Sequence, residues 1–242
     1  FSEDTPKHIA DTLRNGIPQT YSISLEVHCE PTRITLRSSE NKLDDLTLSL
    51  MDKPHRFLQQ TVSTRQCLWR ALQLKSQTRP YVVDCTAGFG EDSFILSILG
   101  ARVVSLEQNG LVAALLNTLV TMLKQQQPSL QWQVHHSQSE QWLRHSTDDY
   151  THVYMDPFFH KKSNAKPKNP IQWLQNLCHE QQPCPEKLLQ SAQQLPVQSI
   201  IVKRAKSAGF LGDIKPDRGS ILQKASRFDC YSPVCTRSNE TS

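Results

Sequence analysis

The chain has 242 residues, with 27 Lys and Arg against 23 Asp and Glu, a formal net charge of +4 and a mean hydropathy of −0.50. No apolar run reaches the roughly 18 residues that a membrane-spanning helix needs, and recurring apolar periodicity argues against a disordered chain. The length suits one α/β domain of moderate size with a small appendage.

The first 53 residues predict a small antiparallel β-sheet. Apolar residues alternate with polar ones at 21–27, at 34–36 and at 46–50, and turn-like breaks separate these segments. The segment is acidic, with nine carboxylates against six Lys and Arg. We therefore predict a β-rich N-terminal unit in residues 1–53 and a larger domain in residues 54–242.

Beyond residue 63 the predicted strands and helices alternate. Such alternation is typical of a mostly parallel sheet with helices on both faces. The predicted helices are at 63–75, 92–99, 111–123, 170–180 and 185–194, and the predicted strands are at 81–85, 102–107, 130–136, 152–156, 199–204, 220–224 and 227–231.

A loop with two glycines, DCTAGFGED, follows the strand at 81–85 and opens the helix at 92–99. Gly88 and Gly90 permit a ligand to approach the backbone, and the helix N-terminus offers free N–H groups. The match to the dinucleotide fingerprint G-x-G-x-x-G is partial, because Ser93 stands at the third position. The carboxylates of Asp84 and Asp92 would repel a pyrophosphate, so they favour a cationic ligand.

A further carboxylate, Glu107, ends the strand at 102–107, where doubly wound folds bind a ribose diol. A sulfonium, an α-amine and a ribose diol without phosphate together describe S-adenosylmethionine, which we predict as the cofactor. The alternative interpretation is a plain strand–turn–helix connection with a surface glutamate.

The strand at 152–156 leads into the segment Asp156-Pro157-Phe158-Phe159, which resembles the N/D-P-P-Y/F motif of amino-group methyltransferases. An exocyclic amine on a base is a weak nucleophile because its lone pair is delocalised. A carboxylate and a carbonyl that accept its N–H groups can hold the lone pair toward the methyl group, while aromatic rings stack on a base taken out of its helix. We predict that these four residues are catalytic; the alternative is a turn with a hydrophobic plug.

Basic residues follow this segment. His160, Lys161 and Lys162 come directly after it, and Lys203 and Arg204 lie further on. Residues 160–242 hold 13 Lys and Arg against six Asp and Glu, so the mild net charge conceals a basic C-terminal part. We predict that these five residues contact RNA, although a solvated charged face is the alternative.

The cysteines give little support for a metal site. Cys178 with Cys184, and Cys230 with Cys235, lack the C-x2-C spacing of zinc ligands. An odd number of cysteines and no visible secretion signal favour a reduced, cytoplasmic protein. We expect no bound metal and no association with a membrane.

The run VDCTAGFGEDSFILSILGARVVSLEQNGLVAALL, from Val83 to Leu116, resembles the RsmJ family of bacterial methyltransferases that act on guanine N2 in small-subunit ribosomal RNA. The resemblance continues through VYMDPFFHKK, IIVKR and SRFDCY and covers roughly residues 55–232. It implies the class I S-adenosylmethionine-dependent methyltransferase fold, a Rossmann-like α/β fold whose seven-stranded, mostly parallel sheet ends in an antiparallel hairpin.

The resemblance also implies a set of cofactor contacts and a substrate. Glu91, Gln108 and Gln138 differ from the residues that the family usually has there. The expected reaction is methylation of guanine N2 in 16S ribosomal RNA, free or in a ribosomal particle. Methylation of adenine N6 or of a protein glutamine, and a non-catalytic RNA-binding module of the same fold, stay open as alternatives, as do the target nucleotide and the oligomeric state. Carried over by position, the cofactor contacts are Glu91, Asp92, Glu107, Gln108, Ser137, Gln138 and Asp156.

Overall fold

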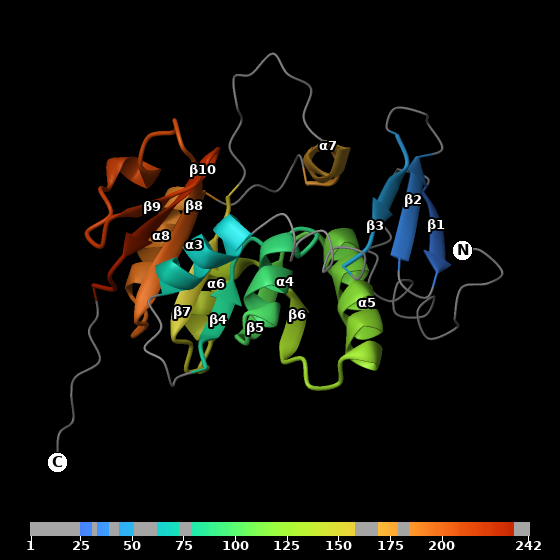
Figure 1. The fold of residues 1–242 in the computed structure, drawn as a ribbon, viewed down its shortest axis with the longest axis horizontal. Coiled ribbons are helices and arrows are strands. Elements are labelled where there is room, and N and C mark those ends of the chain that lie inside the picture. Colours follow the sequence, from blue (N-terminus) through green and yellow to red (C-terminus); the bar gives the residue numbers. More distant parts are fainter. Residues whose placement is uncertain are drawn as a thin grey trace.

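The computed structural model describes residues 25–30, 33–38, 44–50, 62–72, 79–157, 169–178 and 184–234. Its centre is a seven-stranded sheet in the order β6-β5-β4-β7-β8-β10-β9 (Figure 1). The strands are β4 (Tyr81–Asp84), β5 (Arg102–Glu107), β6 (Trp132–His136), β7 (His152–Met155), β8 (Ser199–Ala205), β9 (Ser220–Leu222) and β10 (Ser226–Tyr231).

The first five strands of this sheet are parallel, and β10 pairs antiparallel with both β8 and β9. This arrangement confirms the predicted mostly parallel sheet with an antiparallel final hairpin. The strand order reverses at β4, which lies between β5 and β7. In doubly wound folds ligands bind at the carboxyl ends of the strands beside such a reversal.

Helices cover both faces of the sheet. Successive strand residues point to opposite faces, so the apolar residues of the buried strands contribute to two hydrophobic clusters. Val82 and Val103 belong to one hydrophobic cluster and Val83 and Val104 to another. The first cluster includes α3 (Val62–Leu72), α4 (Glu91–Ile98), α5 (Gly110–Gln126) and α7 (Asn169–Leu177), and the second includes α6 (Ser139–His145), α8 (Pro185–Gln193) and the short η1 (Leu211–Asp213).

The predicted N-terminal sheet is confirmed as three antiparallel strands, β1 (Leu25–Glu30), β2 (Arg33–Ser38) and β3 (Leu46–Leu48). Figure 1 shows it beyond α5, at the opposite end of the molecule from β9 and β10. Ile34 and Leu46 belong to the same hydrophobic cluster as Trp173 of α7, whose Nε1 donates a hydrogen bond to Asp44 O at 2.9 Å. The described N-terminal residues therefore share a core with the larger part of the chain.

Helix α6 was not predicted, because its seven residues are too few to establish a helical apolar period. It is nevertheless anchored, since Ser139 Oγ donates a hydrogen bond to Cys85 O at 2.6 Å and Leu143 is buried. Among the described residues, no helix is both long enough and apolar enough to cross a membrane.

Candidate functional site

The predicted cofactor loop lies between β4 and α4, at the carboxyl edge of the sheet. Gly88 has φ +52° and Gly90 has φ +77°, a left-handed conformation that a side chain disfavours. A Cβ at Gly90 would clash with Leu116, and a Cβ at Gly88 would lie 3.3 Å from Leu174. The left-handed conformation therefore favours glycine at both positions, and close packing adds to this preference at Gly90.

Asp84 fixes the conformation of this loop through hydrogen bonds. Its Oδ1 accepts a hydrogen bond from Thr86 N at 3.0 Å, and its Oδ2 accepts one from Ser93 Oγ at 2.5 Å. Ser93 Oγ also lies 2.6 Å from Ser105 Oγ, which accepts a hydrogen bond from Trp132 Nε1 at 2.8 Å. Asp84 is buried, and desolvation raises its pKa to about 7 against the opposing effect of its hydrogen bonds. Its role in this structure is to shape the loop.

Glu107 ends β5 and faces the same loop. Its Oε2 accepts a hydrogen bond from Gly88 N at 2.9 Å, and its Oε1 accepts one from Asn109 N at 2.8 Å. Burial raises the pKa of Glu107, and these backbone hydrogen bonds oppose the rise. Asn109 in turn caps α5 through a hydrogen bond from Val112 N. The carboxylate is thus fixed in position at the end of β5, beside β4, where the strand order reverses.

Asp156 lies just beyond β7, where it forms a charged cluster with Lys203 and Asp92. Lys203 Nζ is 2.9 Å from Asp156 Oδ2 and 2.7 Å from Asp92 Oδ2, and Tyr154 Oη donates a hydrogen bond to Asp92 Oδ2 at 2.8 Å. The backbone N–H of Asp156 donates to Thr86 Oγ1 at 2.6 Å, which ties the end of β7 to the cofactor loop. The structure thus joins the two segments that the sequence singled out, through contacts from α4, β7, β8 and the loop that follows β4.

In this cluster, burial and the opposite charge of the partner act against each other on the pKa values of Asp156 and Lys203. Desolvation raises the pKa of Asp156 to about 6, although Lys203 opposes the rise. Burial alone would lower the pKa of Lys203, but the carboxylates of Asp92 and Asp156 raise it above its ordinary value. The side chain of Asp156 is still 39% exposed, so one part of this carboxyl group faces outward and can meet a ligand.

Lys203 and Arg204, which we predicted as RNA contacts, bind other residues of the protein in this structure. Lys203 is ion-paired with two carboxylates and its side chain is only 24% exposed. Arg204 is buried, and its Nε and Nη2 donate to Gly209 O at 3.2 and 2.9 Å. Both cations serve contacts inside the protein, because strand pairing turns these two side chains inward from opposite faces of β8.

The other predicted cofactor residues lie around the same edge. Gln108 follows β5, and its carbonyl oxygen is 3.1 Å from His136 Nε2. Ser137 follows β6 and donates its N–H to Glu107 O at 3.0 Å. Gln138 precedes α6 and is exposed, as is Glu91 in the first turn of α4. All four residues lie at the ends of strands or helices along this edge, and their roles as cofactor contacts stay predictions.

The predicted catalytic segment is described only in part. Pro157 is buried beside Asp156. Phe158, Phe159, His160, Lys161 and Lys162 lie outside the described residues, so their predicted roles are unchanged.

Three residues of the candidate site were missed or misinterpreted from the sequence. Ser93 was noticed only as a departure from the dinucleotide fingerprint, whereas its hydroxyl binds Asp84. Thr86 and Tyr154 were not singled out at all. The available signal was their position, because each lies within two residues of a predicted site carboxylate.

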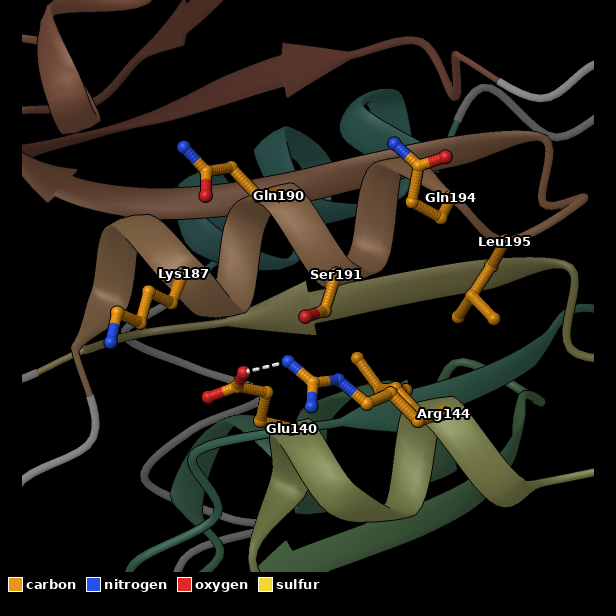
Figure 2. Close-up of a pocket in the computed structure, with 8 residues that line it drawn as sticks. Glu140, Arg144, Lys187, Gln190, Ser191, Gln194 and Leu195 are labelled. Carbon is orange, nitrogen blue, oxygen red and sulfur yellow. Dashed lines mark hydrogen bonds and ion pairs between the residues drawn. The ribbon is translucent and has the colours of Figure 1, made fainter.

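A hollow of about 670 Å³ lies elsewhere, between α6 and α8 (Figure 2). Figure 2 shows Glu140 and Arg144 paired on α6 and facing Lys187 and Ser191 of α8. None of its lining residues belongs to the predicted site. In the described part of the chain, no group of three or more His, Cys, Asp and Glu side chains could hold a metal ion.

Comparisons with known proteins agree with this geometry. The family described as "Putative SAM-dependent methyltransferase" matches residues 12–233. A solved structure of a SAM-dependent methyltransferase from Neisseria gonorrhoeae has a TM-score of 0.72 at 20% identity and covers 100% of this chain and 98% of its own. That likeness shows the fold.

Curated relatives carry the name Ribosomal RNA small subunit methyltransferase J. The protein from Desulfotalea psychrophila is 32% identical over 174 residues, which cover 70% of this chain and 66% of the relative. The protein from Psychromonas ingrahamii is 29% identical over 235 residues, or 89% of this chain and 87% of the relative, and that from Aeromonas hydrophila is 33% identical over 172 residues, or 69% and 68%. The chain therefore belongs to the family of S-adenosylmethionine-dependent methyltransferases that includes the small-subunit ribosomal RNA methyltransferase J proteins.

Proposed function

We propose that the protein transfers a methyl group from S-adenosylmethionine to the exocyclic N2 of a guanine in small-subunit (16S) ribosomal RNA. The observation that carries this proposal is the carboxylate of Asp156, which is partly open and tied to the cofactor loop through Thr86. Membership of the family supports S-adenosylmethionine as the cofactor, and the names that the curated relatives carry support small-subunit ribosomal RNA as the substrate.

The residues present fit the cofactor. The two oxygens of Glu107 accept backbone N–H groups from Gly88 and Asn109, and a carboxylate oxygen can accept a further hydrogen bond from a ribose hydroxyl. The left-handed conformations of Gly88 and Gly90 shape the loop along which the cofactor would lie. Asp92 and Asp156 give the edge negative charge, which suits a ligand that carries a sulfonium and an α-ammonium group. Gln108, Ser137 and Gln138 would then border the adenine, and Glu91 the start of α4.

The chemistry assigned to this chain is the positioning of an amine. When bound, S-adenosylmethionine supplies a methyl group on a sulfonium, which is already a good electrophile. Asp156 accepts a hydrogen bond from the target N–H and holds the nitrogen lone pair toward that methyl group, while the carbonyl of Pro157 can accept the second N–H. Transfer would leave the electron pair of the S–C bond on the sulfur as the N–C bond forms, and the proton lost by the nitrogen would pass to the Asp156 carboxylate or to water.

Lys203 has a supporting part in this proposal. Its ammonium group lies between Asp92 and Asp156 and offsets the repulsion between the two carboxylates. It therefore keeps Asp156 ionised and fixes its Oδ2, which makes Lys203 a positioning residue. Phe158 and Phe159 are proposed to stack on the guanine, and His160, Lys161 and Lys162 to contact the RNA backbone of a ribosomal particle in the cytoplasm.

The experiment that tests the proposal is transfer of a tritiated methyl group to ribosomes or ribosomal RNA from a strain that lacks the enzyme, followed by nucleoside analysis. We expect label in N2-methylguanosine of small-subunit RNA. Label only in N6-methyladenosine, or only in protein glutamine, would contradict the guanine assignment. RNA binding without any binding of S-adenosylmethionine would instead support a non-catalytic module.

A further inference from the structure

Two loops lie side by side at the carboxyl end of β8, next to the charged cluster. The first, the 206 loop, comprises residues 206–210 and follows β8; the second, the hairpin turn, comprises residues 223–225 and joins β9 to β10. Strand pairing sets Ser226 opposite Ala205, and Lys206 N donates to Ala225 O at 3.1 Å. Lys203, which contacts Asp156, lies on β8 three residues before Lys206, the first residue of the 206 loop. Both loops therefore lie at the same edge of the sheet as the proposed methyl-transfer site.

The 206 loop is held from inside by Arg227. This buried guanidinium donates through Nη1 to the carbonyl oxygens of Lys206 and Ala208, at 2.9 and 2.7 Å, and through Nη2 to that of Gly209 at 3.1 Å. Arg204 donates two further hydrogen bonds to Gly209 O. Such a set of charge-assisted hydrogen bonds fixes one backbone conformation of the loop. A loop fixed in this way presents its outer side chains in a constant arrangement.

The outer side chains are two cations and an aromatic ring. Lys206 and Lys224 are exposed. Phe210 is 37% exposed, and the guanidinium of Arg227 lies 5.1 Å from its ring centroid. Neither residues 204–212 nor residues 218–228 contain an Asp or Glu. The two loops themselves therefore carry cations and no carboxylate, beside an exposed ring that packs on Arg227. The first carboxylate after the 206 loop is the exposed Asp213, whose N–H donates to Phe210 O at 3.3 Å.

We propose that the 206 loop and the hairpin turn form a contact surface for single-stranded RNA, with Lys206 and Lys224 on phosphates and Phe210 stacked on an unpaired base. This inference rests on the proposed function, and it replaces Lys203 and Arg204 by exposed neighbours. Ammonium groups bind the RNA backbone without sequence preference, and aromatic rings stack on bases of any sequence. A ring beside cations, continuous with the site, favours RNA over a protein partner.

The test uses the full chain and an in vitro transcript of 16S ribosomal RNA, with binding measured over a series of salt concentrations. The variants are Lys206→Glu with Lys224→Glu, Phe210→Ala, and Lys187→Glu as a matched control. Lys187 is exposed on α8, beside the hollow in Figure 2. Affinity for S-adenosylmethionine and the thermal unfolding midpoint check that each variant keeps its fold and its cofactor site.

We expect the double lysine variant to weaken RNA binding by at least tenfold. Its slope of log affinity against log salt should fall by about 1 to 2, because two phosphate contacts are lost. Phe210→Ala should weaken binding by about tenfold with an unchanged salt slope, since stacking is not ionic. Lys187→Glu should resemble the wild type, as should S-adenosylmethionine binding in all variants.

Two results would overturn the inference in different ways. If the wild type binds and methylates the RNA but the double lysine and Phe210 variants match Lys187→Glu, the RNA contacts lie elsewhere and the proposed function stands. If the wild type neither binds nor methylates the RNA, the proposed function and this surface are both wrong.

Discussion

Two charged networks meet at β8, through the neighbouring residues Lys203 and Arg204. Lys203 points to the face of α4 and pairs with Asp92 and Asp156, whose side chains are 15% and 39% exposed. Arg204 points to the other face and lies beside Arg227, which forms an ion pair with the fully buried Asp229 at 2.8 Å. Adjacent residues of one strand thus take part in an open network and in a closed one.

The difference in exposure indicates different uses. A closed network such as Arg227 with Asp229 cannot exchange its partners for a ligand, and its charges are costly to leave unpaired. It can only fix the structure around it, which here includes the 206 loop. In the open network, Asp156 can keep its contact with Lys203 and still accept a hydrogen bond from outside. We therefore expect changes in the open network to affect activity first and changes in the closed network to affect stability first.

The largest expected effect on activity is that of Asp156→Ala. Removal of the carboxylate leaves the target amine without its acceptor, and we expect methyl transfer to fall by about 10²- to 10³-fold or more. The fold should persist, because this side chain is partly exposed. Tritiated-methyl transfer measures the rate, and Glu140→Ala on the surface of α6 is the matched control. Near-wild-type activity in Asp156→Ala would remove this residue from the mechanism.

The largest expected effect on stability is that of Arg227→Leu in the closed network. It leaves Asp229 buried without its cation, which should lower the free energy of unfolding by about 3–5 kcal/mol. Denaturant unfolding measures the change. Arg144→Leu, at an exposed ion pair on α6, should cost less than about 1 kcal/mol. Replacing both Arg227 and Asp229 by leucine should recover part of the loss; a loss below 1 kcal/mol in Arg227→Leu would contradict the assignment of this network to stability.

Lys203→Met tests the positioning part of the open network. Without the ammonium group, Asp92 and Asp156 repel each other and the pKa of Asp156 rises. If ionised Asp156 is needed, kcat should fall by about tenfold at neutral pH and the acidic limb of the kcat profile should move to higher pH.

Lys203→Arg keeps the positive charge and is the conservative control for this variant. We expect it to restore much of the rate and the position of the pH profile. A purely structural role for Lys203 would lower the unfolding midpoint in Lys203→Met without moving that profile, and this result would contradict the positioning role.

The sequence predicted most of the fold because its signals are local. Buried strands such as Tyr81–Asp84 and Arg102–Glu107, each followed by an apolar helix, are sufficient to predict a parallel sheet, and the carboxyl ends of such strands meet at one edge. Asp84, Glu107 and Asp156 could therefore be placed near one another before the structure was known. Helix α6 could not be predicted, because its stability comes from contacts such as Ser139 to Cys85.

The roles of Lys203 and Arg204 could not be predicted from the sequence, for a different reason. A basic pair is compatible both with a nucleic-acid contact and with internal ion pairs, and the choice depends on partners that are distant in the chain. Lys203 and Asp92 are 111 residues apart. Pairing of β8 with β7 and β10 determines which face each side chain occupies, and local charge carries no information about it.

The smallest expected effect is on the pH dependence of stability, and it comes from Asp84 beside the open network. Asp84 is buried next to the open network and its pKa is about 7, above the value of 3.8 for an exposed aspartate. Between these pH values the folded state binds more protons than the unfolded state, so the free energy of unfolding falls as the pH rises. From pH 6 to pH 8 this group should lower the free energy of unfolding by about 1.4 kcal/mol. Asp84→Asn does not titrate, and the hydroxyl of Ser93 can turn to accept the amide N–H. Denaturant unfolding at both pH values should therefore show a smaller fall in the free energy of unfolding for Asp84→Asn than for the wild type. Equal falls would show that Asp84 is ionised throughout this pH range and that its burial does not make stability depend on pH.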